Sequence, residues 1–122
     1  MGYTNSSLVD YKILTGMHSG QRDHAIDTIT IHCVVGQTSA DSLGYYFRTI
    51  EASSNYGVGY DGKIGLYVEE KNRAWTTSSY ANDRRAVTIE VASDTFEPYK
   101  VTTAAYNALI KLVADICKRN GI

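Results

Sequence analysis

The segment TITIHCVVGQT, from Thr28 to Thr38, decides the predicted fold because apolar and polar residues alternate along its first eight positions. Alternation with a period of two is typical of a β-strand that buries one face. We expect the following residues to face the core: Ile29, Ile31, Cys33 and Val35. The opposite face carries Thr28, Thr30, His32 and Val34. The imidazole of His32 is therefore expected to point to a groove or to solvent.

A second segment, AVTIEVA at 86–92, alternates in the same way and carries an ionisable residue on its polar face. Its apolar face holds Val87, Ile89 and Val91, whereas Glu90 lies on the other face. If the two strands are neighbours, His32 and Glu90 converge on one groove. Imidazole and carboxylate are the groups that metal-assisted hydrolysis uses, one to hold the metal and the other to move protons. A solvated or hydrogen-bonded histidine and a surface glutamate are the alternatives that spacing alone leaves open.

The remaining pattern predicts a mixed α/β fold. Ser39 is a good N-cap for a helix that we expect to end near Glu51, and Thr102 or Thr103 caps a second helix that ends at a left-handed Gly121. Between them, residues 53–70 are predicted to form a hairpin with a type I′ turn at Asp61-Gly62. Residues 1–25 are expected to be irregular. The order strand, helix, hairpin, strand, helix predicts a mixed sheet of at least four strands with helices packed on it.

Length and composition narrow the classes of protein further. A chain of 122 residues is expected to form one domain, and its net charge of -1 provides no basic field for nucleic acid or an anionic membrane. No apolar run is long enough to span a bilayer, and the first twenty residues lack the pattern of a signal peptide. The two cysteines, Cys33 and Cys117, form no CxxC motif and are expected to be buried thiols.

Three segments, in this order, resemble the zinc-dependent N-acetylmuramoyl-L-alanine amidases, the superfamily that also contains peptidoglycan recognition proteins and phage endolysins. They are ITIHCVVGQ at 29–37, SSNYGVGYDGKIGLYVEEKNRAW at 53–75 and AVTIEVA at 86–92. The clostridial cell-wall amidase and endolysin branch is the most similar. The resemblance implies a mixed central β-sheet flanked by α-helices. It also implies that residues 1–122 are a single, partial N-terminal amidase catalytic domain.

The resemblance assigns roles to five residues. It implies that His32 is a zinc ligand, that Glu90 and Tyr56 are catalytic, and that Trp75 and Thr76 lie at the substrate groove. Glu90 would serve as a base or proton shuttle, and the hydroxyl of Tyr56 would donate a hydrogen bond to the developing oxyanion. Many relatives have histidine where this chain has Thr76.

The implied reaction is hydrolysis of the amide between N-acetylmuramic acid and L-Ala in peptidoglycan, as in a phage endolysin or a secreted autolysin that acts on the bacterial cell wall. A non-catalytic peptidoglycan-binding module and an inactive truncated fragment are the alternatives. In the family a further strand and helix follow, with the remaining zinc ligands, and no histidine follows His32 here. We therefore expect an incomplete Zn²⁺ site, and self-association through the strand edge or helix surface that the further segment would cover.

Overall fold

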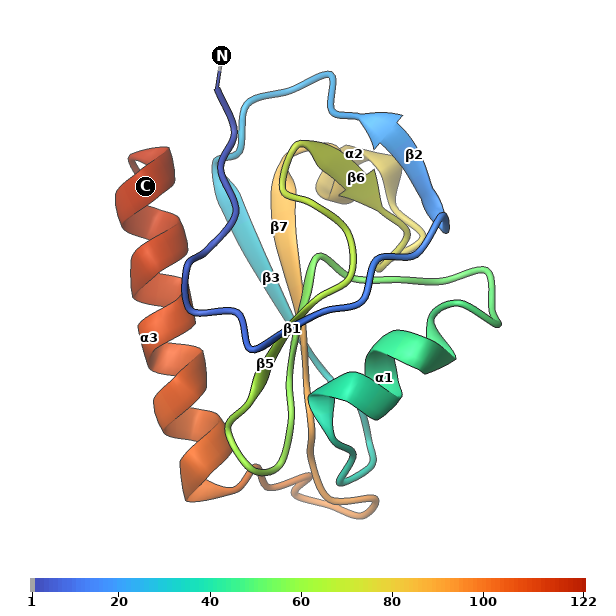
Figure 1. Ribbon diagram of the computed structural model, residues 1–122, viewed down its shortest axis with the longest axis vertical. Coiled ribbons are helices and arrows are strands. Elements are labelled where there is room, and N and C mark those ends of the chain that lie inside the picture. Colours follow the sequence, from blue (N-terminus) through green and yellow to red (C-terminus); the bar gives the residue numbers. More distant parts are fainter. Residues whose placement is uncertain (1) are drawn as a thin grey trace.

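A five-stranded mixed β-sheet forms the centre of the computed structural model, which describes residues 2–122 (Figure 1). The strands are, in spatial order, β1 (Tyr11–Lys12), β5 (Ile64–Leu66), β4 (Tyr56–Val58), β7 (Ala86–Val91) and β3 (Thr28–Cys33). The pair β4–β5 is antiparallel, and the other three pairs are parallel. The expected mixed sheet is confirmed.

Two helices cover opposite faces of this sheet (Figure 1). Helix α1 (Ala40–Tyr46) begins after Ser39, whose side chain accepts a hydrogen bond from the amide of Ser42 as predicted for an N-cap. It ends before the predicted Glu51, because the amides of Arg48 and Thr49 bond to carbonyls only three residues back. Helix α3 (Thr103–Asn120) has the predicted caps, with Thr102 at its start and a left-handed Gly121 at its end.

Each face of the sheet has its own apolar cluster. On the α3 side, the buried side chains include Tyr56, Val87, Ile89, Leu112 and Ile116. On the α1 side, a smaller cluster contains Ile13, Leu43, Phe47 and Tyr67. The predicted core face of β7 is confirmed, since Val87, Ile89 and Val91 are all buried.

The predicted core face of β3 is wrong for three of its four residues. Ile31 is 49% exposed, Val35 is 48% exposed and Cys33 is also exposed. β3 is the edge strand of the sheet, so α3, which packs against the central strands, leaves its outer part uncovered. The alternating pattern indicates which face of the strand a residue occupies, but not whether a helix packs on that face. The other cysteine, Cys117, is only partly buried.

The N-terminal segment is more regular than predicted. It contains β1 and also β2 (His18–Gln21), which pairs with β6 (Asn72–Ala74) in a separate two-stranded antiparallel sheet. The partners of both strands lie about fifty residues away along the chain, so no local pattern reveals them. A short helix, α2 (Tyr80–Asp83), lies beside this small sheet (Figure 1).

The hairpin β4–β5 is also confirmed, but its turn differs from the prediction. The loop runs over residues 59–63, and only Gly62 of the predicted pair has a positive φ, of 83°. The side chain of Asp61 instead accepts a hydrogen bond from the amide of Lys63. A longer Asx-type loop therefore replaces the predicted two-residue turn.

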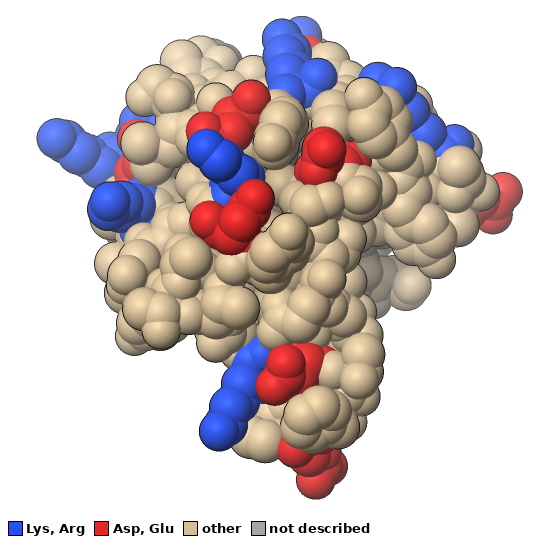
Figure 2. All heavy atoms as spheres, turned by 60° about the horizontal axis from the view of Figure 1, so that its bottom comes forward, with Lys and Arg blue, Asp and Glu red and all other residues tan. Residues whose placement is uncertain are grey.

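The surface carries charges of both signs. On the face that Figure 2 shows, Lys and Arg side chains are interspersed with Asp and Glu, and neither sign gathers into one patch. Within residues 2–122, no helix is both long and apolar enough to cross a membrane.

Candidate active site

His32 and Glu90 meet on adjacent strands. They are paired in the parallel register of β3 and β7, and Nδ1 of His32 lies 3.3 Å from a carboxylate oxygen of Glu90. The prediction that the two side chains share one face of one sheet is thereby confirmed. The side chain of His32 is 40% exposed and that of Glu90 is 15% exposed. The pair is therefore reached from solvent mainly through the imidazole.

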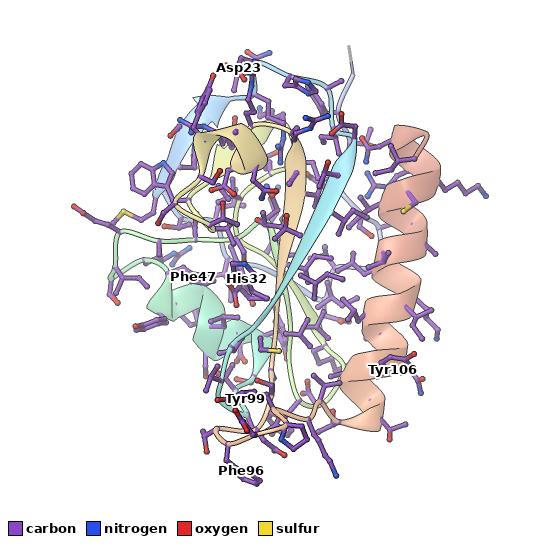
Figure 3. All side chains as sticks on the ribbon, turned by 180° about the vertical axis from the view of Figure 1, so that it is seen from behind. Asp23, His32, Phe47, Phe96, Tyr99 and Tyr106 are labelled. Atoms are coloured by element: carbon purple, nitrogen blue, oxygen red, sulfur yellow. The ribbon has the colours of Figure 1, made fainter. Side chains whose placement is uncertain are left out.

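The pair lies on the α1 side of the sheet. Val34, two residues after His32 and on the same face of the chain, packs against the cluster of Leu43, Phe47 and Tyr67. Figure 3 shows His32 beside Phe47 of this layer, on the opposite side of the strands from α3. The site is thus separated from the larger hydrophobic core by the sheet itself.

Tyr67 and two glycines form the floor beside Glu90. Gly57 is the partner of Glu90 on β4, and Gly65 is the partner of Gly57 on β5. The ring of Tyr67 covers both glycines, because a Cβ atom on Gly57 would lie 2.3 Å from the Tyr67 hydroxyl oxygen. That hydroxyl donates a hydrogen bond of 2.6 Å to the carbonyl of Ala40. An aromatic ring therefore occupies the space that two side chains would otherwise fill.

This environment changes the acidity of Glu90. Burial raises the pKa of the Glu90 carboxyl above its usual range, and the neighbouring His32 partly opposes that effect. Burial likewise raises the pKa of Tyr67, with smaller contributions from Asp41 and Glu90, so its hydroxyl stays neutral. A carboxyl whose pKa is raised holds its proton more readily at neutral pH, which suits a group that must both accept and give a proton.

The loop that carries Trp75 and Thr76 lies on the same side of the sheet. The hydroxyl of Thr76 donates a 2.7 Å hydrogen bond to that of Thr88, which precedes Glu90 by two residues on the same face of β7. Trp75 is 36% exposed, and its indole N–H donates to the hydroxyl of Ser19. Both residues line a hollow of about 400 Å³. The structure therefore brings Thr76 next to the strand that carries Glu90, with Trp75 farther out.

A buried polar network fixes this loop to the sheet. The side-chain oxygen of Asn55 accepts hydrogen bonds from the amide of Thr88 and from the guanidinium of Arg22. Arg22 also donates to the carbonyls of Glu70 and Asp83, and burial lowers its pKa to about 10. The carboxylate of Asp83 in turn accepts from the amides of Thr76 and Thr77. Sequence reasoning missed this network because its members lie in four separate segments. The SNY motif around Asn55 is the one signal that could have indicated it.

The structure does not bring Tyr56 to this site. Tyr56 is the partner of Ile89, not of Glu90, so its side chain points to the α3 face, where it is fully buried. Its hydroxyl contacts the carboxylate of Glu70 and accepts a 2.8 Å hydrogen bond from the amide of Ser6. Burial raises the pKa of Tyr56 above its usual value. In this position the hydroxyl of Tyr56 does not face the groove, where an oxyanion would form. Its buried contacts are those of a structural residue.

The described residues supply few ligands for a metal ion. Nowhere in residues 2–122 do three His, Cys, Asp or Glu side chains gather at one point. The Nδ1 atom of His18 accepts a hydrogen bond from the amide of Gly20, and that of His24 contacts the carbonyl of Ala25, so neither joins His32. A catalytic zinc ion usually has three protein ligands. The pair of His32 and Glu90 therefore does not fit such an ion without a further donor.

The sequence matches the model of one known protein family. The family model for N-acetylmuramoyl-L-alanine amidase matches residues 22–122, which contain the paired strands and the Trp75 loop. The chain belongs to this amidase family. Members of the family are generally zinc-dependent. No curated protein matches the sequence as a relative.

Several solved structures share the fold of this chain. The structure of PlyL matches with a TM-score of 0.74 at 17% sequence identity, over 92% of this chain and 74% of the PlyL chain. A selenomethionine derivative of AmpD matches with a TM-score of 0.75 at 18% identity, over 99% of this chain and 81% of that one. The Drosophila peptidoglycan recognition protein PGRP-SA matches with a TM-score of 0.68 at 16% identity, over 89% and 73%. At these identities the similarity shows the amidase-like fold.

Proposed function

We propose that the chain binds the muramyl-peptide part of peptidoglycan on its α1 face and takes part in hydrolysis of the amide between N-acetylmuramic acid and L-Ala. The observation that carries this proposal is the contact between His32 and Glu90 at 3.3 Å, within a chain of the amidase family. Groups of these two types, aligned on neighbouring strands and open to solvent on one side, are what hydrolysis of an amide requires for proton transfer.

Glu90 is the proposed proton-transfer group. Its carboxylate would accept a proton from the attacking water and, once protonated, give it to the leaving amino group of L-Ala. The raised pKa of Glu90 supports this role, since a carboxyl of ordinary acidity is a poor proton donor at neutral pH. His32 would hold the carboxylate through Nδ1. Zinc, when bound in members of this family, polarises the carbonyl and activates water, but the donor set of residues 2–122 lacks at least one ligand for it.

The test is to measure binding and cleavage of an N-acetylmuramoyl peptide on the same sample, with and without added zinc. We expect binding in both conditions. We also expect slow, zinc-stimulated release of the peptide that is lost in Glu90→Gln and in His32→Ala. Glu90→Gln keeps the shape of the side chain, so it should keep the bound ligand. Release that continues unchanged in both variants would contradict the proposed roles of the pair.

A second candidate function is binding of peptidoglycan without cleavage. The specific observation in its favour is the shortage of metal ligands around His32. The fold is also that of the Drosophila protein whose name describes recognition of peptidoglycan. Binding of the muramyl peptide with no release at any zinc concentration would support this candidate over the amidase.

A further inference from the structure

Three apolar side chains are exposed at the end of the sheet that follows the pair of His32 and Glu90. Phe96 is 66% exposed, more than any other large apolar side chain in residues 2–122, and Val35 and Tyr99 are exposed as well. Val35 follows β3, whereas Phe96 and Tyr99 lie between β7 and α3. Figure 3 shows Phe96 and Tyr99 at one end of the molecule, below His32. We call these three residues the apolar ridge.

Hydrogen bonds fasten the two loops that carry the ridge to each other. The amide of Val35 donates a 2.9 Å hydrogen bond to the hydroxyl of Ser93. The side-chain amide of Gln37 donates to the carboxylate of Asp94 and to the carbonyl of Lys100. The loop after β3 and the loop after β7 therefore form one surface.

The backbone keeps two side chains of the ridge exposed at a conformational cost. Val35 has a φ of 61° and Tyr99 a φ of 56°, both in the left-handed region that favours glycine. For a β-branched residue such as valine this conformation is rare. Neither side chain is buried, so packing within the chain does not offset the strain. Strain of this kind clusters at binding sites, and exposed apolar surface also marks them.

The ridge is continuous with the candidate active site. Val35 follows His32 by three residues and Ser93 follows Glu90 by three, so each loop begins at most about 11 Å from the pair. The ridge lies toward the carboxyl ends of β3 and β7, whereas Thr88, which bonds to the Trp75 loop, lies toward the amino end of β7. A ligand with an amide at the pair can therefore extend one of its two sides over the ridge.

We propose that the apolar ridge binds sugar rings of the glycan strand that carries the muramyl peptide. The proposal rests on the proposed function, in which the amide at the pair has a sugar on one side and a peptide on the other. The face of a pyranose ring presents C–H bonds that pack on an aromatic ring, while the hydroxyl and acetamido groups at its edge stay in water. Phe96 provides such a ring, and Tyr99 adds a hydroxyl for the sugar edge.

The charges around the ridge also favour an uncharged ligand. The three side chains of the ridge carry no charge, and the two ionisable residues beside them in the loop, Glu97 and Lys100, have opposite signs. The ridge therefore has no net field that would select an acidic or a basic partner. A neutral sugar matches this surface.

The experiment compares two ligands by titration calorimetry. One is N-acetylmuramoyl-L-alanyl-D-isoglutamate, and the other is the same compound with an N-acetylglucosamine linked on each side of the muramic acid. We expect the wild type to bind the longer ligand about three- to tenfold more tightly, the range of one or two aromatic stacking contacts. Phe96→Ala should remove this preference and leave the affinity for the shorter ligand unchanged.

Two further variants separate binding from folding. Val35→Gly should weaken the preference without lowering the melting temperature, because glycine adopts the positive φ without strain. Tyr106→Ala is the matched control, since it removes an exposed ring from α3 and should leave the preference unchanged.

Equal binding of the two ligands by the wild type would overturn this inference and leave the proposed function standing. So would an equal loss for both ligands in Phe96→Ala, or a dimer in sedimentation that Phe96→Ala dissociates without any effect on the sugar preference. Binding of neither ligand would overturn the inference and the proposed function together.

Discussion

Replacing Tyr56 by Phe should destabilise the fold without changing how the site binds its ligand. The substitution removes one hydroxyl that makes two buried contacts, one to the Glu70 carboxylate and one from the Ser6 amide. A hydrogen bond to a charged group contributes about 1.5–3 kcal/mol, and a buried amide left without a partner costs about 1–3 kcal/mol. Glu70 keeps its 2.7 Å salt bridge to Arg119, so its charge stays paired. The expected loss in the free energy of unfolding is therefore about 2–4 kcal/mol.

The assay is urea denaturation of Tyr56→Phe beside a matched control, Tyr46→Phe. Tyr46 lies on α1 and is 55% exposed, so removing its hydroxyl should change stability by less than about 0.5 kcal/mol. Muramyl-peptide binding per folded molecule should be the same in both variants and in the wild type. A Tyr56→Phe protein of unchanged stability that has lost binding or cleavage would refute this reasoning. It would also return Tyr56 to the catalytic role that the sequence resemblance implies.

Three further predictions concern acidity, the sheet edge and metal. Burial raises the pKa of Glu90, so the folded protein favours the protonated carboxyl and loses stability as pH rises through that pKa. As the pH rises from about 4 to about 8, the free energy of unfolding of Glu90→Gln should therefore increase relative to that of the wild type. A difference between the two proteins that does not change with pH would contradict this. Ile31 borders an apolar groove of about 340 Å³ against Leu109 and Ile110 of α3, on the open edge strand. We expect concentration-dependent dimers in sedimentation that Ile31→Lys abolishes, and a monomeric wild type at high concentration would exclude this surface as a self-association site. After dialysis, elemental analysis should find clearly less than one zinc ion per chain. One zinc ion per chain in the wild type, lost in His32→Ala, would contradict the shortage of metal ligands around His32.

The contact between His32 and Glu90 was predictable because its signal is local. Alternation over six residues fixes which face of a strand a side chain occupies, and two strands with matching patterns placed His32 and Glu90 on one side. The same rule, applied to Tyr56 with its neighbours, would have put that side chain on the opposite face once β4 was paired with β7. The prediction of its role came from the resemblance instead, and the structure does not place it in the groove.

The features that the sequence did not reveal depend on pairing between distant segments. The exposure of Ile31 and Cys33 follows from the position of β3 at the edge of the sheet, and strand order is not encoded in the strand's own pattern. The environment of Glu90 depends on Tyr67 lying over Gly57, and Gly57 becomes a neighbour of Glu90 only when β4 pairs with β7. The hollow lined by Trp75 and Thr76 likewise forms only when the small β2–β6 sheet meets α2. The position of β3 and the β2–β6 sheet both depend on pairing between segments that lie more than fifty residues apart, which no local pattern reveals.

The central claim is that the α1 face, with His32 and Glu90, is the binding site for muramyl peptide. The most direct test is nuclear magnetic resonance of ¹⁵N-labelled protein titrated with N-acetylmuramoyl-L-alanyl-D-isoglutamate. We predict saturable shifts of the His32 and Glu90 amides and of the Trp75 indole, with little change along α3. Shifts confined to α3 and the Ile31 edge, or no shifts at saturating ligand, would contradict the account.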